Sequence, residues 1–194
     1  MRKILTRTER ERKGARNRVI IGLALVAIMV LGTLGYTFYW QTEEEETRIN
    51  YNGVEFVLNE NSLWEFKVQD FEFLTQYNPE DTENISTPIF VTVNNYAGKP
   101  LFFVGGGTGK QEIARNLWDF ILRENDACIK GYEALCEDDA PMKECSEDNI
   151  VIFKEGNFTE ITQEDNCIFI LSSYNEQVRA TDALLFKMLG IKRF

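Results

Sequence analysis

The chain has 194 residues, no histidine and a formal net charge of −10. The missing histidine excludes the Ser-His-Asp and Cys-His catalytic systems and every metal site that uses imidazole. The negative charge repels the phosphates of nucleic acid, so we expect no nucleic-acid partner. From these properties we predict no catalytic residue, no metal and no cofactor.

The first 40 residues divide into a basic start and an uncharged apolar segment. Residues 1–18 carry eight Lys or Arg against two Glu, and Val19 to Trp40 contains no charged side chain. A helix of about 20 apolar residues matches the roughly 30 Å hydrocarbon core of a bilayer. The segment from Val19 to Trp40 therefore predicts a single transmembrane helix that anchors the chain in the cell membrane. Because basic flanks stay in the cytoplasm, everything from Gln41 onward is expected outside.

Two other interpretations of this segment stay open. A cleaved secretory signal has an apolar region of about 7 to 15 residues, which is shorter than the segment here. A prepilin-like leader is suggested by the basic residues before Gly14. Arg16 and Arg18 would then be buried without partners in a filament, at a high cost in free energy. The apolar length favours the uncleaved anchor over both.

The sequence after the apolar segment predicts an acidic stalk over residues 41–49 and one extracytoplasmic domain over residues 50–194. Glu43 to Glu46 form a solvated acidic run. The chain has 21 basic and 31 acidic residues, of which its first 18 residues hold eight and two, leaving 13 and 29 after residue 40. This part of the chain thus has a net charge near −16. Such a charge aids solubility and would attract cations or basic partners.

Apolar runs and alternation predict the strands of the domain. Phe71 and Phe73 resume an alternation out of phase, which predicts a bulge at Gln69-Asp70, and Pro79 then opens a loop. The expected strands are residues 54–58, 63–68, 89–93, 101–104, 150–153, 158–162 and 167–171.

Two main helices are expected between and after these strands. The first follows Gly105 to Gly107 and has its apolar face at Ile113, Leu117, Phe120 and Ile121. The second runs from about Asn175 to Leu189 and stops at Gly190. Each helix follows a strand and a turn, which predicts an α+β fold. In it, a transmembrane helix precedes a mixed β-sheet domain with two main helices.

Four cysteines, Cys128, Cys136, Cys145 and Cys167, lie within 40 residues. In a segment expected outside the cell, an even number of cysteines predicts two disulfides. Three pairings are possible, and we favour Cys128 with Cys136 and Cys145 with Cys167. A zinc site is disfavoured because the spacings of 8, 9 and 22 residues lack the Cys-x-x-Cys knuckle. Free thiols remain a further alternative.

The run Gly105 to Lys110 suggests an anion contact at Gly106, Gly107 and Lys110, because a glycine-rich turn into a helix directs N–H groups outward. The spacing does not match a P-loop, since three residues separate Gly105 from Gly109 and Gln111 follows Lys110. A tight turn that needs positive φ is the favoured interpretation.

Two Asn-x-Ser/Thr tripeptides, at Asn84 and Asn157, are possible glycosylation sites in or beside predicted turns. Adjacent carboxylates at Asp138-Asp139 and Glu164-Asp165 are the remaining catalytic candidates, each in need of an unidentified partner. A glycosidase needs two carboxylates across a cleft, a separation that sequence spacing does not define.

The stretch from Cys128 to Ile191 resembles an uncharacterised group of small single-span archaeal membrane proteins. The resemblance lies in Cys128-Ile-Lys-Gly, Asn149-Ile-Val-Ile, Glu164-Asp-Asn-Cys and Ala180-Thr-Asp-Ala, with the cysteines framing the segment. It implies an outer location and a shared fold, and no activity is attached to the group.

We therefore expect a membrane-anchored, extracytoplasmic binding or scaffolding module of the cell envelope. Its expected partner is an envelope protein or polymer. The alternatives are an extracytoplasmic hydrolase that works through carboxylates and a pilin-like or surface-layer subunit.

Overall fold

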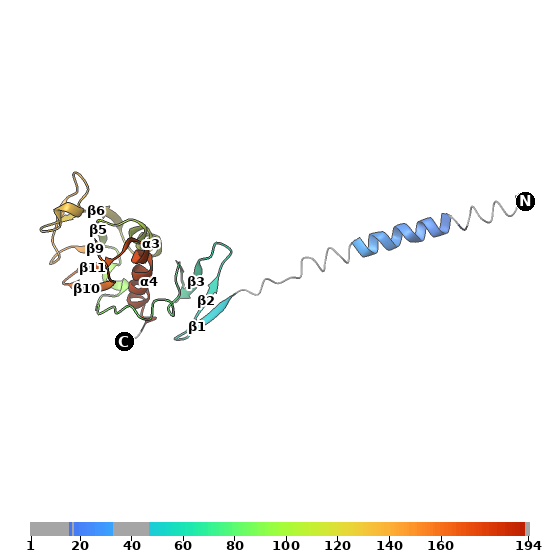
Figure 1. Ribbon diagram of the computed structural model, residues 1–194, viewed down its shortest axis with the longest axis horizontal. Helices are drawn as coiled ribbons and strands as arrows, with labels where there is room; N and C mark the ends of the chain where they lie inside the picture. Colours follow the sequence, from blue (N-terminus) through green and yellow to red (C-terminus); the bar gives the residue numbers. More distant parts are fainter. Residues whose placement is uncertain (1–15, 17, 33–46, 193–194) are drawn as a thin grey trace, which may run out of the picture. The chain divides into compact units, whose positions relative to one another are not determined.

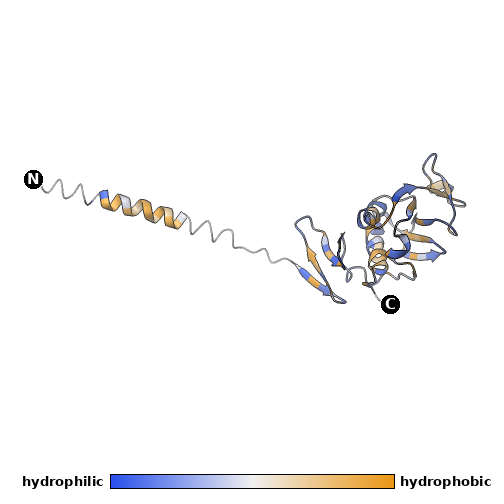
Figure 2. Cartoon of the chain, turned by 180° about the vertical axis from the view of Figure 1, so that it is seen from behind, coloured by the Kyte–Doolittle hydropathy of each residue, from blue (hydrophilic) through white to orange (hydrophobic). Residues whose placement is uncertain are grey.

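The computed structural model describes residues 16, 18–32 and 47–192, and the chain separates into two compact units with the boundary between Glu45 and Glu46. In the first unit, residues 18–32 are helical. Figure 2 shows apolar residues along most of this helix, and Leu23 and Met29 are among its exposed side chains.

Within the described residues, no helix is both long and apolar enough to cross a membrane. The predicted span from Val19 to Trp40 continues through residues 33–40, which lie outside the described part. The same holds for most of the predicted basic tail and for residues 41–46 of the predicted stalk.

The second unit begins with a four-stranded antiparallel sheet, here called sheet A, in the order β1-β2-β3-β4. Its strands are β1 (Arg48–Tyr51), β2 (Val54–Leu58), β3 (Trp64–Val68) and β4 (Phe71–Thr75). Phe56, Phe66 and Phe73 alternate inward from these strands, as a half-buried sheet requires. They pack with Phe186 and Ile191, so residues near the end of the chain complete the core of its first sheet.

A five-stranded mixed sheet, sheet B, forms the centre of the domain in the order β10-β11-β9-β5-β6. Its strands are β5 (Pro100–Val104), β6 (Arg123–Asp126), β9 (Asn149–Glu155), β10 (Glu160–Glu164) and β11 (Cys167–Ser172). Strand β11 lies between β9 and β10 although it follows both in the chain, and only β10 is antiparallel to its neighbour.

Helices α3 (Thr108–Leu117) and α4 (Gln177–Met188) cover one face of sheet B, as Figure 1 shows. The shared core contains Phe103 and Ile170 from the sheet, Leu117 from α3 and Leu184 from α4. A short helix, α2 (Val93–Tyr96), adds Tyr96 to the same core. The predicted α+β class with two main helices is confirmed for this unit.

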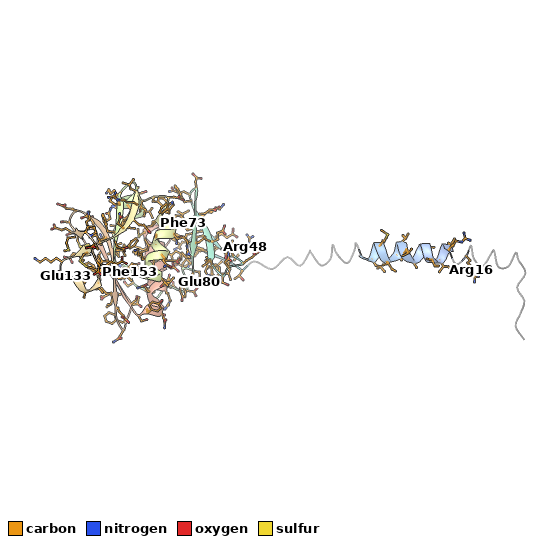
Figure 3. All side chains as sticks on the ribbon, turned by 90° about the horizontal axis from the view of Figure 1, so that it is seen from above. Arg16, Arg48, Phe73, Glu80, Glu133 and Phe153 are labelled. Carbon is orange, nitrogen blue, oxygen red and sulfur yellow. A yellow bond between two sulfur atoms is a disulfide. The ribbon has the colours of Figure 1, made fainter. Side chains whose placement is uncertain are left out.

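Residues 128–148, here called the disulfide loop, cover the opposite face of sheet B. The loop contains β7 (Cys128–Ile129), a 3-10 turn η1 (Glu133–Leu135) and β8 (Met142–Lys143). Ile129 is buried and Leu135 half-buried against Phe102, Ile152 and other apolar residues of the sheet. In Figure 3, Glu133 of this loop and Arg48 of β1 lie at opposite ends of the domain.

Several predicted elements differ from the structure. Residues 89–92 form no strand, and Val93 begins helix α2. Gln69 has φ of 56° in a hairpin turn between β3 and β4, so the predicted bulge is wrong. Strands β1 and β6 were not expected, and β1 begins inside the predicted stalk.

Candidate functional site

Two disulfides, Cys128–Cys136 and Cys145–Cys167, hold the disulfide loop, and they confirm the favoured pairing. The first closes the loop on itself, and the second joins it to the start of β11. All four cysteines form disulfides, which excludes both free thiols and a cysteine zinc site. Such bonds form and persist in oxidising surroundings, so the disulfides suggest an extracytoplasmic location.

A cleft of about 570 Å³ opens along the edge strand β6, beneath the disulfide loop. Phe102 of β5 and residues of β6 form one side, and the loop forms the other. The lining residues are Phe102, Arg123, Asn125, Asp126, Glu137, Asp138, Asp139, Ala140, Pro141 and Lys143.

The charges of the cleft are unevenly placed. Lys143 forms an ion pair with Asp148 at 3.0 Å, and its ammonium lies 4.3 Å from the ring centroid of Phe102. Asp126 is paired with Lys110 of α3. On the rim, Glu137, Asp138 and Asp139 are exposed, so carboxylates dominate the solvent-facing side.

The glycine-rich turn connects β5 to α3 beside this cleft. Gly105 has φ of 66°, and a Cβ there would lie 2.9 Å from the carbonyl oxygen of Phe153. Both observations support the predicted tight turn. At the start of α3, Gln177 Oε1 accepts a hydrogen bond of 3.0 Å from Gly109 N, which satisfies a donor that an anion would otherwise use.

The predicted anion contact is only partly assembled. Gly106 and Gly107 stand at the start of α3, but the Lys110 ammonium binds Asp126. Its charge is therefore directed toward β6, and the anion contact stays a prediction.

We expect Gly109→Ala to destabilise the domain by about 1–3 kcal/mol, the usual cost of overpacking. A Cβ at this position would lie 2.7 Å from Phe153 Cε1 and 2.8 Å from Thr181 Oγ1. Urea unfolding measures the change, with exposed Gln111→Ala on the same helix as a control that should alter stability by less than about 0.5 kcal/mol. Equal losses in the two variants would contradict the close packing.

Both possible glycosylation sites lie on the surface. Asn84 is exposed, and its Oδ1 accepts a hydrogen bond of 2.5 Å from Arg179 Nη2. Asn157 is exposed in the connection between β9 and β10. Glycosylation of either residue stays a prediction.

The structure separates the two predicted carboxylate pairs. Asp138-Asp139 line the cleft beside β6, whereas Glu164-Asp165 lie at the end of β10, the other edge strand of sheet B. Among the described residues, no group of three or more His, Cys, Asp or Glu could hold a metal ion.

Sequence reasoning missed a third carboxylate pair, Glu112 and Asp182, which is buried between α3 and α4. A signal for it exists, because Asp182 follows Val178 by four residues and precedes Leu185 by three. It therefore falls on the apolar face of its helix. The cleft residues of β6 carried no such signal.

Comparison with protein-family models, with curated proteins and with solved structures finds no match to this chain. The resemblance of the segment from Cys128 to Ile191 therefore stays a prediction.

Proposed function

We propose that this protein is a membrane-anchored binding module of the outer cell envelope whose cleft beside β6 receives a positively charged segment of a partner protein. The anchor is supported by the 22 uncharged residues from Val19 to Trp40 that follow a basic start. The outer location is supported by the two disulfides.

The observation that carries the proposal is the cleft itself. It is lined by residues of β6 and of the disulfide loop, and the loop contributes the exposed carboxylates Glu137, Asp138 and Asp139. A lysine or arginine side chain of the partner would place its charge beside these rim carboxylates. The net charge near −16 of residues 41–194 would steer such a partner toward the domain.

Binding is favoured over catalysis by the state of the carboxylates. Asp126 is paired with Lys110, and the three rim carboxylates are exposed. The buried pair of Glu112 and Asp182 does not line the cleft. The hydrolase alternative needs two carboxylates that face one substrate from opposite sides, and the carboxylate on the β6 side of the cleft, Asp126, is held by Lys110.

The proposal predicts that full-length protein in mild detergent binds a fluorescent oligolysine peptide through the rim. The variant Glu137→Gln/Asp138→Asn/Asp139→Asn should bind it at least about threefold more weakly, since an exposed charge pair contributes about 0.2–1 kcal/mol. Added salt should reduce the difference. Fluorescence anisotropy measures both effects.

A matched control removes the same number of charges at the other edge of sheet B, as Glu160→Gln/Glu164→Gln/Asp165→Asn. This variant should keep the wild-type affinity for oligolysine. Equally weaker binding of oligolysine by both variants would show that net charge, and not the cleft, determines the affinity. No binding by the wild type would refute the basic partner. Release of the protein from membranes by alkaline carbonate would refute the anchor.

A further inference from the structure

Two carboxyl groups, of Glu112 on α3 and Asp182 on α4, are buried where the end of β4 packs on these helices. Asp182 is 0% exposed and Glu112 is 3% exposed. Burial of an ionised carboxylate is costly unless a charge or hydrogen bonds compensate it. Arg115, on the same helix as Glu112, supplies one positive charge to the two acids.

The hydrogen bonds distinguish the roles of the two acids. Asp182 Oδ2 accepts a bond of 2.9 Å from the backbone N–H of Tyr77, just after β4. Its other oxygen, Oδ1, is buried and receives no hydrogen bond from a nitrogen or hydroxyl donor in the described residues. Glu112 Oε1 accepts a bond of 2.5 Å from Arg115 Nη2.

The carboxyl groups of Asp182 and Glu112 are within hydrogen-bonding reach of each other. Two ionised carboxylates repel at such a distance, but a proton on one converts the contact into a hydrogen bond. Glu112 already accepts a bond from the Arg115 guanidinium, which suits an anion, whereas Asp182 Oδ1 has none. The proton therefore belongs on Asp182 Oδ1.

We propose that Asp182 and Glu112 share one proton, carried by Asp182 Oδ1, and that this proton closes a pH-dependent latch between sheet A and helices α3 and α4. The latch does not depend on the proposed cleft function. It holds the outer edge of β4, where hydrogen bonds to a further strand would otherwise form.

Side chains of the helices take the place of that strand. Asn116 Oδ1 accepts a hydrogen bond of 2.9 Å from Leu74 N, and Asn116 Nδ2 donates one of 2.8 Å to Leu74 O. Arg115 Nη2 donates to the same carbonyl at 2.8 Å. With the bond from Tyr77 N to Asp182, the segment from Leu74 to Tyr77 is attached to both helices. Arg115, which pairs with Glu112, and Asp182 itself connect this attachment to the acid pair.

The charged groups that act on the two carboxyls are the carboxyls themselves and Arg115, and the segment after β4 contributes the N–H group of Tyr77. Burial, and then the charge of Glu112, hold the pKa of Asp182 well above its ordinary value. Burial also raises the pKa of Glu112. The folded state therefore binds the shared proton more tightly than the unfolded chain, whose carboxyls titrate near pH 4.

The sign of the pH dependence follows from this difference. Below about pH 4 the folded and unfolded states both carry the proton. As the pH rises above that value, the unfolded chain releases it first, so the contribution of the pair to stability decreases until the folded pair also ionises. The latch thus tightens in acid and loosens in base.

The variant Asp182→Asn imitates the protonated acid, since an amide can donate to Glu112 and accept from Tyr77. In full-length protein, the unfolding equilibrium constant of the wild type relative to this variant should rise with pH by up to about tenfold per unit above pH 4. Urea unfolding from pH 4 to 8 measures this ratio. Glu112→Gln removes the other carboxylate of the pair and with it the repulsion. It should flatten the pH dependence of the unfolding equilibrium constant in the same way.

Asp119→Asn removes the same charge at an exposed position just after α3. It should leave the pH dependence of wild-type stability unchanged. Infrared spectroscopy at pH 6 should detect a buried protonated carboxyl in the wild type and lose it in Asp182→Asn. A ratio that does not change with pH, or the absence of that band in the wild type, would overturn the proposal. Should Asp182→Asn fail to fold, the slope of Glu112→Gln and the wild-type band still decide it.

Discussion

Replacing Phe186 by alanine is expected to destabilise the domain by about 3–5 kcal/mol, the usual cost of deleting a buried aromatic ring. Phe186 is fully buried on α4, and its ring centroid lies 5.8 Å from that of Phe56 and 5.7 Å from that of Phe66. The ring is therefore the contact through which α4 completes the core of sheet A. Since few small domains exceed about 15 kcal/mol of stability, such a loss is a large fraction of the total.

Thermal or urea unfolding of the full-length protein measures this loss. Phe158→Ala is a suitable control, because the Phe158 side chain is 62% exposed and its removal should change stability by no more than about 0.5 kcal/mol. A loss below about 1 kcal/mol for Phe186→Ala would contradict the packing of sheet A on α4.

Removing the disulfide between Cys145 and Cys167, by replacing both with alanine, should have the second large effect. Loop-closure entropy alone gives about 3.4 kcal/mol for a separation of 22 residues, within a general range of about 2–5 kcal/mol. Cys167 is also fully buried at the start of β11, so the lost sulfur leaves unfilled space in the core. Urea unfolding under non-reducing conditions measures the change.

The second disulfide provides an internal comparison. Cys128 and Cys136 are separated by only eight residues, for which the same entropy argument gives about 2.5 kcal/mol. We therefore expect their double alanine variant to lose less stability than the variant of Cys145 and Cys167. The reverse order would show that the Cys128–Cys136 disulfide stabilises the fold more than its short sequence separation implies.

The elements with strong hydrophobic patterns could be predicted. Strand β2 was expected with its observed bounds, and α4 was expected near its position because its apolar residues recur at helical spacing. Strand β6 could not be predicted, because Arg123-Glu-Asn-Asp126 has no apolar residue. It forms because β5 provides a parallel partner at the sheet edge.

The opposite error occurred at residues 89–93. Their apolar character comes from packing of Ile89 and Val93 in the helix-side core, and not from a place in a sheet. The cleft could not be predicted either, because its residues come from β5, β6 and the disulfide loop, and only the fold brings them together. The cysteine pairing could be predicted because Cys128 and Cys136 close one loop, and Cys145 and Cys167 precede or begin strands that could lie side by side.

The position of β11 between β9 and β10 has a consequence for synthesis. As the chain emerges from its N-terminal end, β9 and β10 appear before the strand that separates them. The edge of β9 that β11 covers then stays unpaired until β11 has arrived, and the Cys145–Cys167 bond cannot form earlier. We therefore expect a nascent chain arrested before residue 167 to expose the apolar edge of β9 and to bind a chaperone.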